Sequence, residues 1–157
     1  MLVIRQAVAN DVPQIGQLIR ELALYEREPG KAVATDADLL RDGFGPNPRY
    51  FCLMAEWSSQ PAGFALYFHN YSTWQGRWGL FLEDLFVRPA FRGKGIGKAL
   101  FVELARTAKQ KGCGRFDWNV LDWNAPAIAF YEKLGARKLD QWLGMRLEGE
   151  ALNRLAE

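Results

Sequence analysis

The chain of 157 residues has the size of one domain and can bury about two thirds of its unfolded surface in one core, so we expect a single domain over residues 1–157. Acidic and basic side chains nearly cancel at a formal net charge of +2, which argues against a nucleic-acid partner. The first apolar stretch is short and interrupted by Arg5 and Asn10, unlike a signal peptide or a membrane span, so we expect a cytoplasmic protein with no membrane partner.

The first half of the chain is predicted to alternate between strands and helices. Apolar residues at helical spacing follow Asn10 and Asp11, either of which can cap a helix that ends near Tyr25. Thr35 or Asp36 can cap a second, shorter helix. The elements expected here are a strand at 2–8, the two helices, and an antiparallel hairpin of strands at 50–57 and 62–71.

The second half is predicted to continue this alternation. Gly112 and Gly135 mark the ends of two further helices, the second of which starts at Asn124 with Pro126 in its first turn. A helical crossover makes the strands on either side of the first of these helices parallel neighbours. The expected elements are strands at 80–87 and 115–121, the two helices, strands at 136–141 and 143–147, and a short helix or frayed end.

Cysteine and histidine are scarce in this chain. Cys52 and Cys113 are too few and too far apart for a disulfide framework or a zinc cluster, and His69 is the sole histidine, so we expect no metal. Cys52 and His69 can be drawn as a nucleophile and its base, but neither lies in a thiol-enzyme signature.

A glycine-rich turn joins the strand at 80–87 to the next helix. Its glycines let the backbone turn tightly and point successive N–H groups at one spot, where the positive end of the helix dipole adds to them. Lysine and arginine side chains in the same turn add full positive charges. The pattern predicts a phosphate-binding site made of Arg92, Gly93, Lys94, Gly95, Ile96, Gly97 and Lys98.

One residue of the turn excludes two common kinds of phosphate loop. The Walker loop and the dinucleotide fingerprint both require a glycine five positions after Gly93, where this chain has Lys98. The remaining pattern, R-G-x-G-I-G, resembles the acetyl-CoA pyrophosphate loop of the GNAT N-acetyltransferases.

A second motif extends this resemblance. The stretch N-A-P-A-I-A-F-Y-E-K-L-G-A, residues 124–136, resembles the segment that closes the acetyl-CoA site in GNAT enzymes. The phrases LIRELALYE, DLLRDGFG and LEDLFV resemble the diamine acetyltransferase group, so that the resemblance covers essentially the whole chain. It implies an α/β fold with a central, mostly antiparallel mixed sheet, a parallel splayed strand pair and flanking helices, and it implies acetyl-CoA as the cosubstrate.

The resemblance also implies further contacts to the cosubstrate. The main-chain groups of Leu85, Phe86 and Val87 are expected to bind the pantetheine arm or to polarise the thioester oxygen. Asn124 and Ala127 are also expected to contact the cosubstrate. Asn124 can instead cap its own helix, and the sequence leaves both roles open.

Direct attack of an amine on a thioester requires a base for the amine proton and an acid for the departing thiolate. By resemblance, Glu83 is the expected base and Tyr131 the expected acid. Glu83 can alternatively be a salt-bridged strand end, and Tyr131 can simply pack beside Phe130. Asp84 points to the opposite face of the strand from Glu83 unless a bulge intervenes.

The expected substrate is a small cationic amine, because the resemblance implies an acceptor groove rich in carboxylates. Its predicted lining is Tyr25, Glu26, Glu83, Asp84 and Asp117. Two segments depart from the spermidine/spermine enzymes: residues 72–74 lack an acidic residue ahead of the tryptophan, and residues 144–147 lack a tryptophan. These departures favour a smaller amine, such as thialysine, a short diamine or an amino-acid side chain, over a long polyamine.

The sequence is also consistent with two other functions, and the resemblance implies an oligomeric state. A GNAT enzyme that acts on a protein amino terminus or lysine, and an acyl-CoA-binding protein without activity, both fit the same motifs. The resemblance also implies a homodimer that pairs through carboxyl-terminal strands, with Trp142 and Leu143 as contact residues.

Overall fold

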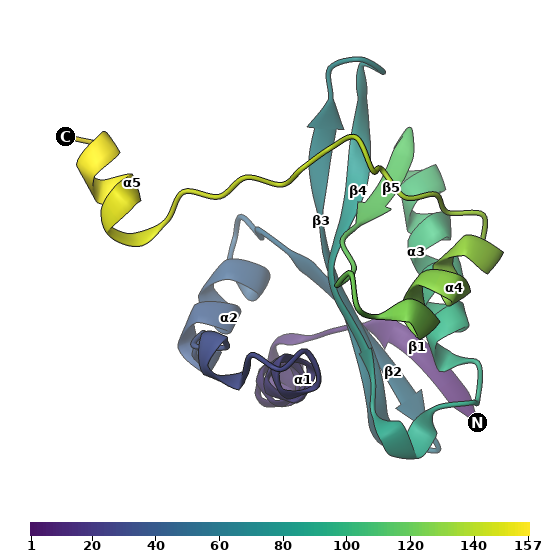
Figure 1. Ribbon diagram of the computed structural model, residues 1–157. Helices are drawn as coiled ribbons and strands as arrows, with labels where there is room; N and C mark the ends of the chain where they lie inside the picture. Colours follow the sequence, from purple (N-terminus) through teal and green to yellow (C-terminus); the bar gives the residue numbers. More distant parts are fainter. The chain divides into compact units, whose positions relative to one another are not determined.

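The computed structural model describes residues 1–157, which form two compact units, Met1–Asn119 and Val120–Glu157 (Figure 1). The first unit contains a five-stranded sheet with three α-helices and three short 3-10 turns. Its strands are β1 (Leu2–Gln6), β2 (Phe51–Trp57), β3 (Gln60–Ser72), β4 (Arg77–Val87) and β5 (Arg115–Trp118). Its helices are α1 (Val12–Tyr25), α2 (Asp36–Phe44) and α3 (Ile96–Gln110), and its 3-10 turns are η1 (Ala9–Asp11), η2 (Pro29–Lys31) and η3 (Pro89–Phe91).

The strands follow one another in the sheet in chain order, β1-β2-β3-β4-β5. Strands β1 to β4 pair antiparallel, and β5 pairs parallel to β4 from Gly79↔Arg115 to Leu82↔Trp118. The parallel pair follows from the crossover through α3, since two parallel strands cannot be joined by a tight turn. The predicted α/β fold with a mixed sheet and one parallel pair is thus confirmed, although β5 ends three residues earlier than expected.

Helices α1 and α2 cover one face of this sheet, and α3 covers the other (Figure 1). On the α1 side, an apolar stripe of the helix meets alternate residues of the strands, because successive strand side chains point to opposite faces. This core consists of Val12, Ile15, Leu18, Leu22, Leu39, Tyr50, Cys52, Met54, Phe64, Leu66 and Phe86. On the other face, Phe101 of α3 packs with its ring centroid 5.5 Å from that of Phe116 and 5.0 Å from that of Trp118.

Of the N-terminal caps predicted for α1 and α2, the cap of α2 is present and the side-chain cap of α1 is not. Thr35 caps α2 as predicted, since its hydroxyl accepts a hydrogen bond from the Asp38 amide at 3.1 Å. Asp11 directly precedes α1, but its carboxylate accepts from the Val8 amide at 2.8 Å and pairs with Arg5 at 2.7 Å. Asp11 therefore fixes the connection between β1 and α1 and does not cap the helix.

The second unit contains α4 (Ala125–Lys133) and α5 (Gly149–Leu155). The strands predicted at 136–141 and 143–147 are wrong, because neither segment forms a ladder in this chain. A strand exists only where its backbone groups pair with another strand, and residues 136–148 are almost entirely exposed without such a partner. None of the helices in either unit has the length and apolar character needed to cross a membrane.

Candidate functional site

The sheet opens between β4 and β5, and this opening is the centre of the candidate site. Pairing of the two strands stops at Leu82, whereas β4 continues to Val87. The Arg88 amide donates to the Ala62 carbonyl of β3 at 2.8 Å. Because ladder hydrogen bonds alternate along an antiparallel strand, the main-chain groups of Leu85 and Val87 point the other way, toward the side where β5 has ended.

The glycine turn follows β4 directly. Gly93 and Gly95 have φ angles of +79° and +77°, which side-chain-bearing residues rarely adopt, and no heavy atom lies within 4 Å of the place where a Cβ would stand on either. Gly95 is the N-cap of α3, and no side chain caps this helix. The first helical amide bond runs from Ala99 to the Gly95 carbonyl, so the preceding amides are available. This arrangement of backbone amides at the start of a helix favours an anion such as a phosphate group.

The three cations of the turn have different surroundings. The Arg92 guanidinium lies 5.1 Å from the ring centroid of Tyr25 and 5.6 Å from that of Phe86, and its Nε donates to the Val87 carbonyl at 2.9 Å. The Lys94 Nζ lies 4.9 Å over the Trp57 ring. Lys98 is exposed on the first turn of α3. Arg92 therefore links the turn to the end of α1, where Tyr25 is predicted to face the substrate.

A bulge in β4 sets Glu83 apart from its neighbours. Leu66 of β3 pairs with Asp84 and the next residue, Tyr67, pairs with Leu82, so Glu83 is the extra residue of the strand. A bulge therefore does intervene between Leu82 and Asp84, and the regular alternation of side chains does not hold for Glu83 and Asp84. Glu83 is exposed and takes no part in the ladder, so its carboxylate can face solvent or substrate.

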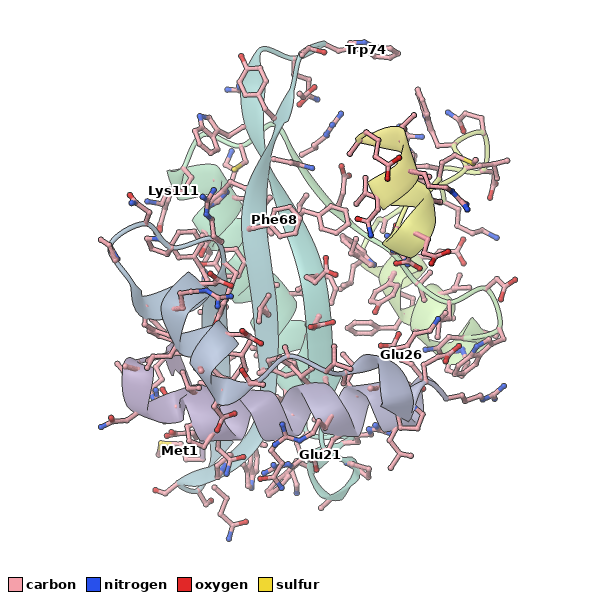
Figure 2. The ribbon with its side chains drawn as sticks, turned by 90° about the vertical axis from the view of Figure 1, so that its left-hand side faces the viewer. Met1, Glu21, Glu26, Phe68, Trp74 and Lys111 are labelled. Carbon is pink, nitrogen blue, oxygen red and sulfur yellow. The ribbon has the colours of Figure 1, made fainter.

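Three of the predicted carboxylates influence one another. Burial, together with the charges of Glu83 and Glu26, raises the pKa of Asp84 to about 7. Burial and the charge of Glu83 also raise the pKa of Glu26, which lies at the end of α1 beside the sheet (Figure 2). The structure thus brings Glu26, Glu83 and Asp84 into one negative cluster that favours a cation.

Asp117, a further predicted substrate residue, lies next to this cluster along the sheet. It is level with Phe81 of β4, two residues before Glu83. Its carboxylate forms an ion pair with Arg115 at 3.2 Å. Arg115 was not among the predicted site residues, although it lies two positions from Asp117 on one strand and so shares a face with it.

The predicted residues of the second unit have local partners there. The Asn124 side chain accepts a hydrogen bond from the Ala127 amide at 3.3 Å, so the capping role that the sequence left open is present. Tyr131 lies on α4 and is half-buried, with its ring centroid 5.7 Å from that of Phe130.

Arg88, the residue that follows β4, is the centre of a hydrogen-bond network that was not predicted from the sequence. Its guanidinium donates to both carboxylate oxygens of Glu21, to Gln14 and to the Pro61 carbonyl, at 2.8 to 3.2 Å. These bonds fasten α1 to the end of β4. No local sequence pattern predicts these hydrogen bonds, because the partners of Arg88 are 27 to 74 residues away in the sequence.

Comparison with known proteins assigns this fold and its glycine turn to an enzyme that transfers an acetyl group. The chain belongs to the GNAT acetyltransferase family, since the profile of the "Acetyltransferase (GNAT) family" matches residues 16–136, which include the glycine turn and α4. The match confirms the resemblance on which the fold was predicted.

Relatives and a solved structure agree with this assignment. A thialysine N-epsilon-acetyltransferase from Sus scrofa is 42% identical over 99% of this chain and 97% of its own length. An L-ornithine N5-acetyltransferase from Arabidopsis thaliana is 32% identical over 97% of this chain and 86% of its own length. An integron cassette protein from the mobile metagenome of V. cholerae superposes with a TM-score of 0.83 at 29% identity, covering 99% of this chain and 98% of that chain.

Proposed function

We propose that this enzyme transfers the acetyl group of acetyl-CoA to the terminal primary amine of a small cationic substrate by direct attack. The observation that carries the proposal is the carboxylate cluster of Glu26, Glu83 and Asp84, which lies where β4 parts from β5 and leads into the glycine turn. A cation is favoured there, and a diphosphate is favoured at the adjacent helix start.

The names of the relatives narrow the substrate class. Thialysine and L-ornithine are both amino acids whose side chains end in a primary amine. The negative cluster of Glu26, Glu83 and Asp84 would attract the side-chain ammonium group of such a substrate. We therefore favour a diamino acid or a short diamine over a long polyamine.

Main-chain groups of the first unit would hold the donor. Acetyl-CoA, when bound, supplies the thioester that the amine attacks. The uncapped amides at the start of α3 would bind its diphosphate, and the amides of Leu85 and Val87 face the open edge of β4. Amides on this edge can bind the pantetheine arm or stabilise negative charge on the carbonyl oxygen.

Side chains would move the two protons of the reaction. Glu83 takes a proton from the substrate ammonium. It can reach the substrate because it is exposed and stands outside the ladder. Asp84 adds its negative charge to the cluster only when it is ionised, and its pKa of about 7 makes this contribution depend on pH near neutrality. Tyr131 gives a proton to the departing sulfur; this role rests on its motif, which lies within the residues that match the family.

Release of free thiol tests the proposal. The protein is incubated with acetyl-CoA and, in separate wells, with diamino acids, short diamines, long polyamines and a lysine-containing peptide. We expect thiol release with the small amines and little with the peptide. Release with the peptide alone would assign a protein substrate, and release with none of the amines would overturn the proposal.

We also propose that two copies of the chain associate through residues 136–148. This segment exposes Trp142, Leu143 and Met145 to 63%, 83% and 93%, and it has no strand partner within the chain. Light scattering after size exclusion measures the mass, which we expect to be that of a dimer, and Leu143→Asp should shift it toward that of a single chain. A single-chain mass at micromolar concentration would contradict this proposal.

A further inference from the structure

Four side chains next to the carboxylate cluster share one face of the sheet. Phe81 of β4 is level with Phe68 of β3 and with Asp117 of β5, and Gly79 is level with Arg115. Residues that are level on neighbouring strands point to the same side of a sheet. This is the side that α1 covers farther along, and Phe68 lies on it beyond the helix (Figure 2).

Arg115 and Asp117 form a half-exposed ion pair on this face. The Arg115 Nε lies 3.2 Å from Asp117 Oδ2, and 43% and 32% of the two side chains are exposed. The stem of Arg115 runs beside Gly79, since its Cγ lies 3.6 Å from the place where a Cβ of Gly79 would stand. A pair this exposed adds little to stability, and each partner keeps hydrogen-bonding capacity for another ligand.

The aromatic rings beside the pair form an apolar surface. The ring centroids of Phe68 and Phe81 are 5.2 Å apart, with 32° between the ring planes, and both side chains are only partly buried. An aliphatic chain packs favourably on such rings.

We propose that Arg115 and Asp117 bind the α-carboxylate and the α-ammonium group of a diamino-acid substrate while its aliphatic chain packs on Phe68 and Phe81. This inference rests on the proposed function and names the substrate class of the same site. The terminal amine then lies toward Glu83, which takes its proton.

The spacing of these residues suits such a substrate. Asp117 is level with Phe81, and the bulge places Asp84 two regular strand steps beyond Phe81. Glu83 precedes Asp84, so the α-amino-acid end and the base are separated by less than about 7 Å along the strand direction. The side chains of ornithine and thialysine, with three and four atoms between the α-carbon and the terminal nitrogen, span this separation.

Arg115 makes the site selective. The guanidinium presents two parallel N–H donors to a carboxylate, and a diamine has no carboxylate to accept them. A diamine instead places an ammonium group at each end, and the far one meets the positive charge of Arg115. A diamino acid is therefore favoured over the diamine that lacks only its carboxylate.

Matched pairs of substrates isolate this effect. We compare ornithine with 1,4-diaminobutane, and thialysine with bis(2-aminoethyl) sulfide, because each diamine is its amino acid without the carboxylate. The measurements are kcat/KM for each compound and calorimetric affinity in the presence of coenzyme A. Arg115→Gln is the test variant, and Arg106→Gln is the control, since Arg106 is exposed on α3 and pairs only with Glu103 at 3.4 Å.

We expect the wild type to prefer the amino acid of each pair. Arg115→Gln should lower kcat/KM and affinity for the amino acids by about tenfold or more, as loss of a charged hydrogen-bonded partner predicts, with the diamines unchanged or improved. Arg115→Lys should retain part of the preference, and Arg106→Gln should retain all of it. Asp117→Asn should weaken both compounds of each pair, since both carry an ammonium group at that end.

Each contrary result has a separate meaning. An equal loss for amino acids and diamines in Arg115→Gln, with an unchanged melting temperature, would show a general role for Arg115 and overturn the inference. A wild-type preference for the diamines would overturn it while leaving the proposed function intact. Acetylation of none of the four compounds would overturn both.

Discussion

Arg88 and Glu21 form an ion pair at 2.9 Å that joins the end of β4 to α1. The Arg88 side chain is only 18% exposed, and it also donates to the Pro61 carbonyl at 2.8 Å and to Gln14 at 2.9 Å. The pair holds the strand that carries Glu83 and Asp84 against the helix that ends next to Glu26. The negative cluster thus depends on a contact between elements that are distant in the sequence.

Arg88→Gln is expected to destabilise the protein and to weaken the site together. Loss of the guanidinium leaves Glu21 and the Pro61 carbonyl without their donor, at a cost of about 1–3 kcal/mol in the free energy of unfolding. We also expect a higher KM for the amine, because α1 is no longer fixed against β4. Thermal melting and steady-state kinetics measure the two effects, and Arg41→Gln, at an exposed pair on α2, is the control. A lower melting temperature with unaltered KM would limit Arg88 to a structural role.

Glu83→Gln is expected to lower kcat/KM without lowering the melting temperature. The side chain is exposed and stands outside the ladder, so the substitution changes the chemistry and leaves the sheet intact. The loss should be larger at pH 6 than at pH 9, because fewer amines are already deprotonated at the lower pH. A pH–rate profile of both enzymes checks this, and two parallel profiles would remove Glu83 as the base.

Asp84→Asn is expected to raise stability at neutral pH. The pKa of Asp84 is raised to about 7 in the folded protein, so the folded state holds a proton that the unfolded state releases at lower pH. Stability therefore decreases as the pH rises from about 4 to about 7, and the neutral amide avoids this loss. We expect a gain of about 1–3 kcal/mol at pH 8 that disappears near pH 4.

Melting temperatures across this pH range measure the effect of Asp84. The exposed Asp122→Asn serves as the control and should follow the wild type. The KM for the amine should also fall between pH 6 and pH 8 in the wild type as Asp84 ionises, and this trend should vanish in Asp84→Asn. Curves for Asp84→Asn that follow the wild type at every pH would contradict the raised pKa.

Gly95→Ala is expected to weaken coenzyme A binding by about tenfold or more. A side chain at a φ of +77° strains the backbone and enters the space that the diphosphate needs. Gly112→Ala is a matched control, because Gly112 has a φ of +73° with the same open surroundings but follows the other end of α3. Calorimetry should show loss of affinity in the first variant only. Equal coenzyme A affinities in the two variants would show that the glycine turn does not bind the diphosphate.

Tyr131→Phe is expected to lower turnover by about a hundredfold with little change in acetyl-CoA affinity. The substitution removes only the hydroxyl, which is the group proposed to protonate the sulfur. Burst kinetics and calorimetry separate turnover from affinity, and Phe130→Leu is the control for packing of the two neighbouring rings. Unchanged turnover would exclude Tyr131 as the acid.

Local signals predicted most of the first unit. The glycine turn, the helix after it, the hairpin and the parallel strand pair all follow from short-range patterns, and the structure has each of them. The negative cluster was predicted by resemblance, and its three members do interact. The proton transfers assigned to Glu83 and Tyr131 stay predictions.

Features that depend on distant partners were not predictable in this way. The alternation of apolar residues in 143–147 indicates a strand, but a strand also needs a partner strand, and this segment pairs with no strand of the chain. The rings under Arg92 and the carboxylate beside Arg88 come from other elements, so no spacing in the sequence reveals them. The position of the bulge depends on the pairing of β4 with β3.

The bulge in β4 has a consequence for how this site can change over evolutionary time. Since Leu66 and Tyr67 pair with Asp84 and Leu82, loss of the single codon for Glu83 would leave a regular, fully paired strand with every other side chain on its present face. The proposed base is thus carried on an insertion that the fold does not need. A descendant without Glu83 would keep the architecture and the glycine turn and would lose the proposed base.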